Sequence, residues 1–318
     1  MNIDVNLDTN QLAEAVNNAY NKAYQTTGQQ PNIMQIEVDD TIHSKTVEET
    51  SFLSYLRMKN CETSAKASKV SFIEETPTNT AAAIAETANL PDYAITSYTE
   101  HTDIMRTIAT GFKVSYMAQM GTNFKDILQT EINRGYILVN NLIDNMLLNG
   151  NSTSNALEFD KVWNNVNAAD NDGDALSEDN IDDILTTIKG QGGSPDVIVT
   201  DSFVAKQLKK IAAPYRRYND KIDIGLGFRV ITYESLNGRE LAVLIDENMP
   251  VTGTGADEEH MMLALDSSTI SIKTLLPPSL FDIPSSNLAY NKAIATFTTA
   301  RNLAPWKSGV ITGIGASE

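Results

Sequence analysis

The feature of the sequence that most constrains its fold is an alternation of apolar and polar residues over thirteen positions, Ile104 to Tyr116. A period of two is typical of a β-strand with one buried face, and this stretch is well beyond the usual strand of about five or six residues. A shorter alternation at Val70 and Phe72 precedes it, and residues 76–99 between them are rich in Thr, Ala, Asn and Glu. A long strand pair with a polar tip cannot bury both faces in its own domain, so we predict a projecting hairpin that needs a partner surface. The apolar positions of the longer stretch share one parity, interrupted by Arg106 and Thr110: Ile104, Ile108, Phe112, Val114 and Tyr116.

A second strong signal predicts a long helix over residues 122–149. Thr122 or Asn123 can cap it, and Gly150 can end it in a left-handed conformation. Twenty-eight residues would make a rod of about 40 Å. Gly135 inside it indicates close packing, because glycine lowers helix stability there. We expect the helix to pack against strands near 104–118 and 290–300 through a stripe of apolar residues at three- and four-residue spacing: Phe124, Ile127, Leu128, Ile132, Leu138, Val139, Leu142, Ile143, Met146 and Leu147.

The rest of the chain divides into an arm, an α/β unit and a β-rich end. Residues 8–24 read as an amphipathic helix, whereas residues 32–66 show no sustained period and read as an extended arm. The α/β unit spans 177–249, and we expect the stretch from 262 to 301 to be rich in strands. Within the α/β unit the sequence predicts a helix from Ser177 to Gly190, a buried strand at Val197–Val199, a helix capped by Asp201 or Ser202, and two strands joined at Asn237-Gly238.

Composition excludes several classes of protein. The 318 residues include 24 Lys and Arg against 41 Asp and Glu, a formal net charge of −17, which argues against a dedicated nucleic-acid binder. Cys61 is the single cysteine, so no intrachain disulfide can form, and three scattered histidines make a multi-histidine zinc site improbable. We expect no signal peptide at the acidic N-terminus and no membrane span, because no apolar run approaches 18 residues.

For three short motifs, a purely structural interpretation is stronger than a functional one. Asp170–Asp174 resembles a calcium loop, but Ala168 and Asp179 stand where key ligands belong, which favours a solvated acidic turn. The glycines of Gly190–Pro195 follow a helix instead of opening one, so they predict a helix end. Gly225–Phe228 matches the spelling of a peptide-carboxylate loop, a weak signal for a peptide-binding module. The sequence has no nucleophile elbow, Walker loop or His-Glu helix motif, so we predict no enzyme activity, no cofactor and no metal site.

A basic cluster leaves three interpretations open. Nucleic-acid contact, pairing with acidic groups of a neighbouring molecule and a solvated helix face are all compatible with it. The cluster places six of the 24 basic residues within sixteen positions: Lys206, Lys209, Lys210, Arg216, Arg217 and Lys221.

The order of these elements resembles the major capsid proteins of tailed bacteriophages with the HK97-type fold. The resemblance covers about residues 50–316. Lys69–Glu75 and Ile104–Tyr116 resemble the two strands of that family's extended loop, and the phrase Leu147-Leu148-Asn149-Gly150 resembles the end of its spine helix. Gly193–Thr200 and Val230–Glu234 resemble strands of its axial domain, and the stretch from Ala293 to Ile311 resembles its closing strand and exit.

The resemblance implies an α+β fold and a structural function. The expected parts are an N-terminal arm at 1–66, an extended loop at 67–112, a peripheral domain at 113–165 and 262–318, and an axial domain at 166–261. The chain would self-assemble as hexamers and pentamers into an icosahedral head shell around double-stranded DNA held non-specifically, with no membrane involved. A separate scaffolding protein, a portal protein and decoration proteins are the implied partners, and assembly would occur in the host cytoplasm before the protein resides in the virion.

Two alternatives remain at this point. One is a nanocompartment shell of the encapsulin type, which has the same fold, and the other is a monomeric α/β module that binds a ligand or peptide. Under the shell reading, the candidate residues for contacts between subunits are Phe72, Glu74, Glu75 and Glu86 in the extended loop and Lys206, Lys209, Lys210, Arg216, Arg217 and Lys221 in the basic cluster.

Overall fold

The computed structural model describes residues 50–76, 83, 86, 96–121, 126–212, 222–223, 229–234, 240–254, 258–285 and 287–315. The chain divides into two units, Met1–Lys45 and Thr46–Glu318, and every described residue belongs to the second. The helix predicted at 8–24 therefore lies outside the described residues, as do most of the predicted arm and most of the hairpin tip. The described end of the arm differs from our expectation, because it forms helix α2 (Ser51–Met58) and strand β1 (Glu62–Ser64) instead of an extended segment.

One sheet has four strands in the order β1-β11-β12-β4. Strands β11 (Ile270–Ile283), β12 (Ala289–Asn302) and β4 (Arg106–Ser115) pair in antiparallel fashion, and β1 joins the edge in parallel with β11. The predicted alternation is confirmed for β4, where Ile108 and Val114 are buried. It is divided at Met105, because Ile104 ends the preceding strand β3 (Ser97–Ile104), and Tyr116 begins the short helix α3 (Tyr116–Gly121).

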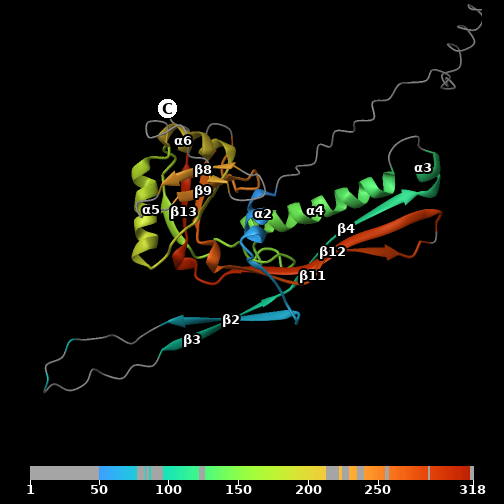
Figure 1. Cartoon of the computed structure of the whole chain (residues 1–318), viewed down its shortest axis with the longest axis horizontal. Coiled ribbons are helices and arrows are strands. Elements are labelled where there is room, and N and C mark those ends of the chain that lie inside the picture. Colours follow the sequence, from blue (N-terminus) through green and yellow to red (C-terminus); the bar gives the residue numbers. More distant parts are fainter. Residues whose placement is uncertain are drawn as a thin grey trace, which may run out of the picture. The chain divides into compact units, whose positions relative to one another are not determined.

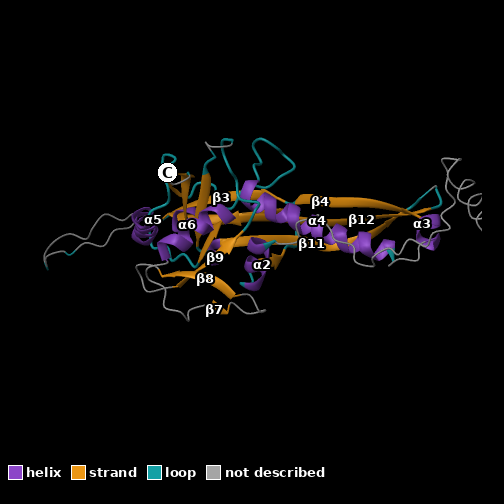
Figure 2. Cartoon of the chain, turned by 90° about the horizontal axis from the view of Figure 1, so that it is seen from above, coloured by secondary structure: helices purple, strands orange, loops and turns teal. Residues whose placement is uncertain are grey.

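The predicted long helix is α4 (Ile127–Asn149), which lies along β4 and β12 (Figures 1 and 2). Gly135 faces the sheet so closely that an added Cβ would lie 2.7 Å from the Ile294 Cδ1 atom, which confirms the close packing predicted there. Asp126 caps the helix, its side chain accepting a hydrogen bond from the Gln129 N–H, and the expected caps at 122 and 123 lie outside the described residues.

Two expectations for this helix were wrong. Val139 and Met146 are buried as expected, and Leu128 and Ile132 are half-buried, but Leu142 is exposed at 46%. The apolar stripe is therefore wider than the face that the sheet covers. Gly150 has a φ of −59° and is not left-handed; glycine is needed there because a Cβ would lie 2.2 Å from the Phe159 carbonyl oxygen.

The second sheet has seven strands and forms the α/β unit. Ser177 caps α5 as predicted by accepting from the Asn180 N–H, and Asp201 accepts from the Val204 N–H at the start of α6. The elements of this unit are α5 (Glu178–Gly190), α6 (Ser202–Ala212) and strands in the order β5 (Asn167–Asp170), β13 (Gly309–Ile314), β10 (His260–Leu265), β6 (Val197–Thr200), β9 (Glu240–Ile245), β8 (Arg229–Glu234) and β7 (Ile222–Asp223).

Two of the domain boundaries expected from the sequence fall inside strands, and the one between residues 112 and 113 lies within β4. A boundary between residues 261 and 262 would cut through β10, and β13 pairs with β10 and β5 instead of joining the four-stranded sheet. The chain crosses from one sheet to the other through the short 3-10 helices η3 (Ser267–Thr269) and η4 (Pro305–Lys307).

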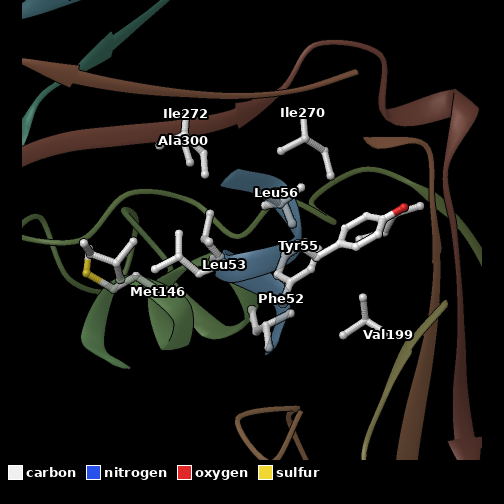
Figure 3. Close-up of a cluster of buried hydrophobic side chains, with 14 of the residues drawn as sticks. Phe52, Leu53, Tyr55, Leu56, Met146, Val199, Ile270, Ile272 and Ala300 are labelled. Atoms are coloured by element: carbon white, nitrogen blue, oxygen red, sulfur yellow. The ribbon is translucent and has the colours of Figure 1, made fainter. Parts of the chain in front are cut away.

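Helix α2 occupies the centre of the larger hydrophobic core (Figure 3). Phe52, Leu53 and Leu56 are at most 1% exposed, and the same buried cluster includes Met146 of α4, Val199 of β6, and Ile270 and Ile272 of β11. Burial of an apolar side chain of this size stabilises a fold by roughly 1.5–3 kcal/mol. The helix therefore joins α4 and the two sheets into one core.

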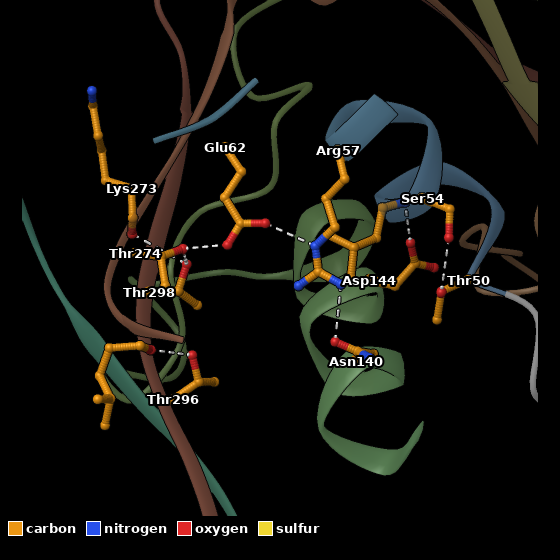
Figure 4. A network of polar contacts seen from close by, with 12 residues as sticks. Thr50, Ser54, Arg57, Glu62, Asn140, Asp144, Lys273, Thr274, Thr296 and Thr298 are labelled. Carbon is orange, nitrogen blue, oxygen red and sulfur yellow. Dashed lines mark hydrogen bonds and ion pairs between the residues drawn. The ribbon is translucent and has the colours of Figure 1, made fainter. Parts of the chain in front are cut away.

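Polar contacts reinforce this junction (Figure 4). Arg57 of α2 donates to Glu62 of β1 at 2.8 Å and to the side-chain oxygen of Asn140 of α4 at 3.2 Å. Glu62 in turn accepts from the Thr274 hydroxyl of β11 at 2.7 Å. Because charged hydrogen bonds are directional, this network fixes the rotation of α2 about its axis.

Candidate assembly surfaces

Strands β2 (Lys69–Thr76) and β3 form a two-stranded sheet of their own. Their register pairs Lys69 with Ile104 at one end and Thr76 with Ser97 at the other. A hairpin is therefore present, but the expected return strand was wrong: β3 returns the chain, and the alternating stretch after Ile104 forms β4, which pairs with β12. A two-stranded ribbon is marginal in water unless one face is packed against something. The contacts of its two faces therefore decide what the hairpin can do.

One face of the hairpin is held by Arg301 of β12. The Arg301 Nη1 atom lies 3.0 and 3.1 Å from the two carboxylate oxygens of Asp103, and the guanidinium lies 6.0 Å from the centroid of the Phe72 ring. Further along, the His101 Nε2 atom and the Glu74 carboxylate are 2.9 Å apart. Phe72 and Glu74, both predicted as interface residues, are half-buried on this face.

The opposite face is exposed and carries two large apolar side chains. Ile73 is 72% exposed and Tyr98 is 64% exposed. Their cross-strand partners are acidic, since Ile73 pairs with Glu100 and Tyr98 with the exposed Glu75. Large apolar side chains gathered on one exposed surface mark an interaction site. Glu86, also predicted, is exposed in the hairpin tip.

The basic cluster is described only in its first half. Lys206, Lys209 and Lys210 are exposed on α6, whereas Val204 and Leu208 of the same helix are buried in the smaller core. The α6 lysines therefore form a cationic face on the outside of the α/β unit. Arg216, Arg217 and Lys221 lie outside the described residues.

A buried pair of carboxyl groups was not predicted. Asp144 of α4 is 0% exposed and Asp246, at the end of β9, is 3% exposed. The backbone N–H of Leu53 donates to Asp144 at 2.8 Å, and that of Phe52 donates to Asp246 at 3.2 Å. The two carboxyl groups thus cap the first turn of α2, because they accept hydrogen bonds from N–H groups that have no partner within the helix.

Asn248 completes this arrangement. Its side chain donates to Asp144 at 2.8 Å, and its backbone N–H donates to Asp246 at 3.0 Å. Burial, and secondly the charge of Asp246, raise the pKa of Asp144 to about 7. The one sign in the sequence was an acidic residue within the apolar stripe of the long helix, which could have been read as a buried carboxyl group.

Among the described residues there is neither a cluster of metal ligands nor a helix that could cross a membrane. No three His, Cys, Asp or Glu side chains there gather in a way that could hold a metal ion. None of the helices in the described part of the chain has the length and apolar character needed to cross a membrane.

Comparisons with known proteins agree on one class. A family model described as "SU10 major capsid protein" matches residues 16–315. No curated protein matches the sequence.

Three solved structures illustrate that similarity. The capsid of cyanophage A-1(L) superposes with a TM-score of 0.68 at 11% identity, covering 90% of this chain and 98% of that chain. The capsid of a native GTA particle gives 0.64 at 14% identity, with 91% and 98% covered. The SrpI encapsulin of Synechococcus elongatus PCC 7942 gives 0.61 at 11% identity, with 87% and 94% covered. At these identities the likeness establishes the fold, which is shared by phage capsids and an encapsulin.

Proposed function

Since this chain belongs to the SU10 major capsid protein family and has the HK97-type capsid fold, we propose that copies of it assemble as hexamers and pentamers into an icosahedral phage head that encloses double-stranded DNA. Its role is that of a structural protein of the virion capsid. We propose further that it has no enzymatic activity, that it assembles in the host cytoplasm, and that it works with separate scaffolding, portal and decoration proteins.

The parts of the fold have corresponding proposed roles. Residues 1–66 form the N-terminal arm, 67–112 the extended loop, 113–165 and 262–318 the peripheral domain with α4 as its spine, and 166–261 the axial domain. The sheet topology supports moving all of β10 and β13 to the axial domain, because both are central strands of the seven-stranded sheet. Strands β11 and β12 with α4 then form the centre of the peripheral domain, and β4, which pairs with β12, enters that sheet from the extended loop.

The observation that carries the proposed assembly is the exposed face of the hairpin. Ile73 and Tyr98 leave most of their side-chain surface exposed to water, at 72% and 64%. A second copy of the chain would bury that surface, and a contact repeated head to tail closes rings or shells.

The test is the double variant Ile73→Ser, Tyr98→Ser, measured by size-exclusion chromatography and negative-stain microscopy. We expect wild-type protein, expressed with its scaffolding protein, to form capsomers or particles, whereas the double variant stays soluble and folded but unassembled. The control is Leu157→Ser, which removes a residue 78% exposed outside the hairpin and should leave assembly intact. Deleting residues 78–92 should likewise abolish particles while leaving soluble protein. A wild-type protein that remains a monomer under all conditions would contradict the proposal.

A nanocompartment shell is the second candidate, because an encapsulin shares the fold. Family membership favours the phage head. The contents of purified particles distinguish the two, since a head encloses DNA and a nanocompartment encloses protein.

The basic cluster has a proposed role in contacts between subunits. Several like-charged copies around one axis would repel each other at distances that salt screens only beyond about 8–10 Å, and acidic groups of neighbours would relieve that repulsion. We expect joint charge reversal of Arg216 and Arg217 to weaken capsomers, with partial rescue by added salt. Normal assembly with reduced DNA packaging would favour nucleic-acid contact instead.

A further inference from the structure

Two helices of the α/β unit carry opposite charge on their outer faces. Residues 170–183, which lead into α5 and form its first half, include seven acidic residues and no basic one. Residues 202–212, which form α6, include three lysines and no acidic residue. Both helices bury their apolar side chains in the smaller core, so their outer faces are polar. The exposed acidic side chains of α5 are Glu178, Asp179 and Asp183, and the exposed basic side chains of α6 are Lys206, Lys209 and Lys210.

None of these six side chains forms an ion pair with another residue in the described part of the chain. Like charges four residues apart on a helix repel each other, and both Asp179 with Asp183 and Lys206 with Lys210 have this spacing. Each face therefore carries a repulsion that an opposite charge would relieve.

The helix dipole explains only part of the pattern. Acidic residues are favoured in the first turn of a helix and basic residues in the last, which accounts for the acidic start of α5, for Lys189 near its end and for the basic end of α6. The effect falls off beyond the terminal turns. Asp183 lies in the second turn of α5, and Lys206 lies nearer the start of α6 than its end, so these two charges need another explanation.

The spacing of the charges on one face matches that on the other. Asp179 and Asp183 are separated by about 6 Å along the helix axis, as are Lys206 and Lys210. Two such helices laid side by side bring two carboxylates opposite two ammonium groups. Figure 1 shows α5 at the left-hand side of the α/β unit and α6 across its top. The two faces therefore lie on different sides of one copy, as a head-to-tail contact requires.

We propose that the lysine face of α6 binds the acidic face of α5 on a second copy of this chain. The inference rests on the proposed shell function and deepens it, because it names the acidic partner of the basic cluster. Nucleic acid would account for the lysines but would leave the acidic face of α5 unexplained. Exposed ion pairs add little stability and are screened by salt, whereas opposite charges across an interface speed association and suppress wrong arrangements. The contact therefore selects which sides of neighbouring copies meet.

The first test uses a carbodiimide, which couples a lysine amine to a carboxylate that it touches. Particles assembled from equal amounts of ¹⁴N- and ¹⁵N-labelled wild-type protein are treated, digested and analysed by mass spectrometry. We expect peptides of α6 joined to peptides of α5 in mixed-label pairs, at least tenfold more abundant in particles than in unassembled protein. Coupling of α6 to α5 only within one copy, or to another acidic segment such as residues 1–45 in place of α5, would overturn the inference.

The second test reverses the charges. Lys206→Glu with Lys210→Glu places acidic groups opposite acidic groups, and Asp179→Lys with Asp183→Lys places basic groups opposite basic groups. We expect each pair to reduce particle yield at least tenfold. All four substitutions in one chain restore opposite charges, so we expect at least a fivefold recovery over either pair. A general loss of stability would not be repaired by adding further substitutions.

The matched control is Lys66→Glu with Lys113→Glu, at two exposed lysines outside the α/β unit, and it should assemble normally. Each unassembled variant should unfold close to the wild-type temperature, because every substituted side chain is exposed. Normal particle yield from the α6 pair, or no recovery in the fourfold variant, would overturn the inference. Normal yield with less packaged DNA would assign the α6 lysines to nucleic acid. Absence of particles from wild-type protein would instead contradict the proposed function itself, which is a separate outcome.

Discussion

The buried pair Asp144 and Asp246 makes the stability of the chain depend on pH in an unusual direction. The pKa of Asp144 is raised from 3.8 to about 7, so the folded protein binds more protons than the unfolded chain between those values. The free energy of unfolding must then fall as pH rises through this window. Most paired carboxylates have lowered pKa values and act in the opposite sense.

The magnitude follows from the shift. One pKa unit corresponds to about 1.36 kcal/mol, so the full difference between the protonated and ionised forms of Asp144 is about 4 kcal/mol. Of this, about 2–3 kcal/mol is lost between pH 5 and pH 8, because the unfolded group is already ionised at pH 5. The variant Asp144→Asn keeps the shape and stays neutral. Its amide can donate to Asp246 while its oxygen accepts from the Leu53 N–H.

The assay is urea unfolding of unassembled wild-type and Asp144→Asn protein at pH 5, 6, 7 and 8, followed by circular dichroism. Any loss of packing or of the Asn248 hydrogen bond in the variant is independent of pH. The diagnostic quantity is therefore the slope of the free energy of unfolding against pH. We expect the free energy of unfolding of the variant, relative to wild type, to rise by about 2–3 kcal/mol from pH 5 to pH 8. Parallel curves for the two proteins would refute the reasoning, because they would show that Asp144 does not change its protonation in this range.

Three further substitutions test the packing. Gly150→Ala should destabilise the chain by more than about 2 kcal/mol in thermal or urea unfolding, because its Cβ would lie 2.2 Å from the Phe159 carbonyl oxygen; Gly190→Ala, with nothing within 4 Å of the new Cβ, is the control and should be neutral or slightly stabilising. Phe52→Ala should cost about 3–5 kcal/mol by leaving a cavity in the core, and an effect below about 1 kcal/mol would contradict the central position of α2. Leu142→Asp should leave the unassembled protein folded with an unchanged unfolding temperature, since Leu142 is 46% exposed; insoluble protein would show that the exposed face of α4 is covered within the chain.

Elements with a long, regular period could be predicted from the sequence. Strand β4 and helix α4 each repeat their apolar residues over several turns or pleats, so both the element and its inward face follow from the spacing. The outgoing strand β2 was expected as well, but its partner β3 has no alternation of apolar residues, so the return strand was wrongly assigned to the stretch that forms β4. In the α/β unit the caps at Ser177 and Asp201 marked the helix starts, because side-chain oxygens that bond free N–H groups are a local property.

Helix α2 was missed for a physical reason. Its buried residues Phe52, Leu53, Tyr55 and Leu56 do have helical spacing, and Ser54 between them is exposed. Eight residues make only about two turns, however, which is shorter than the window of about 11–18 residues over which a helical period can be recognised. The place of β13 was hidden for a related reason, since a short apolar strand carries no information about which of two sheets it joins.

Leu142 and Arg106 departed from the expectations for a different reason than α2 and β13. Leu142 follows the apolar spacing of α4, and Arg106 falls among apolar residues of a predicted strand, yet one is exposed and the other has a buried donor without a partner. Both depart from the rule that apolar groups are covered and buried polar groups are bonded. Natural sequences break such local rules mainly where function requires it.

The proposed function of a shell subunit is contact with other copies. Apolar side chains that one chain leaves exposed are therefore candidates for surfaces that other copies cover. Ile73 and Tyr98 lie on the exposed face of the hairpin, and Asp103 near its base pairs with Arg301 of β12. The anchor to β12 and the exposed face therefore belong to the same two strands. A second copy packed on Ile73 and Tyr98 would bury the face that this chain leaves exposed, so a strand pair that is marginal alone would be stabilised from both sides.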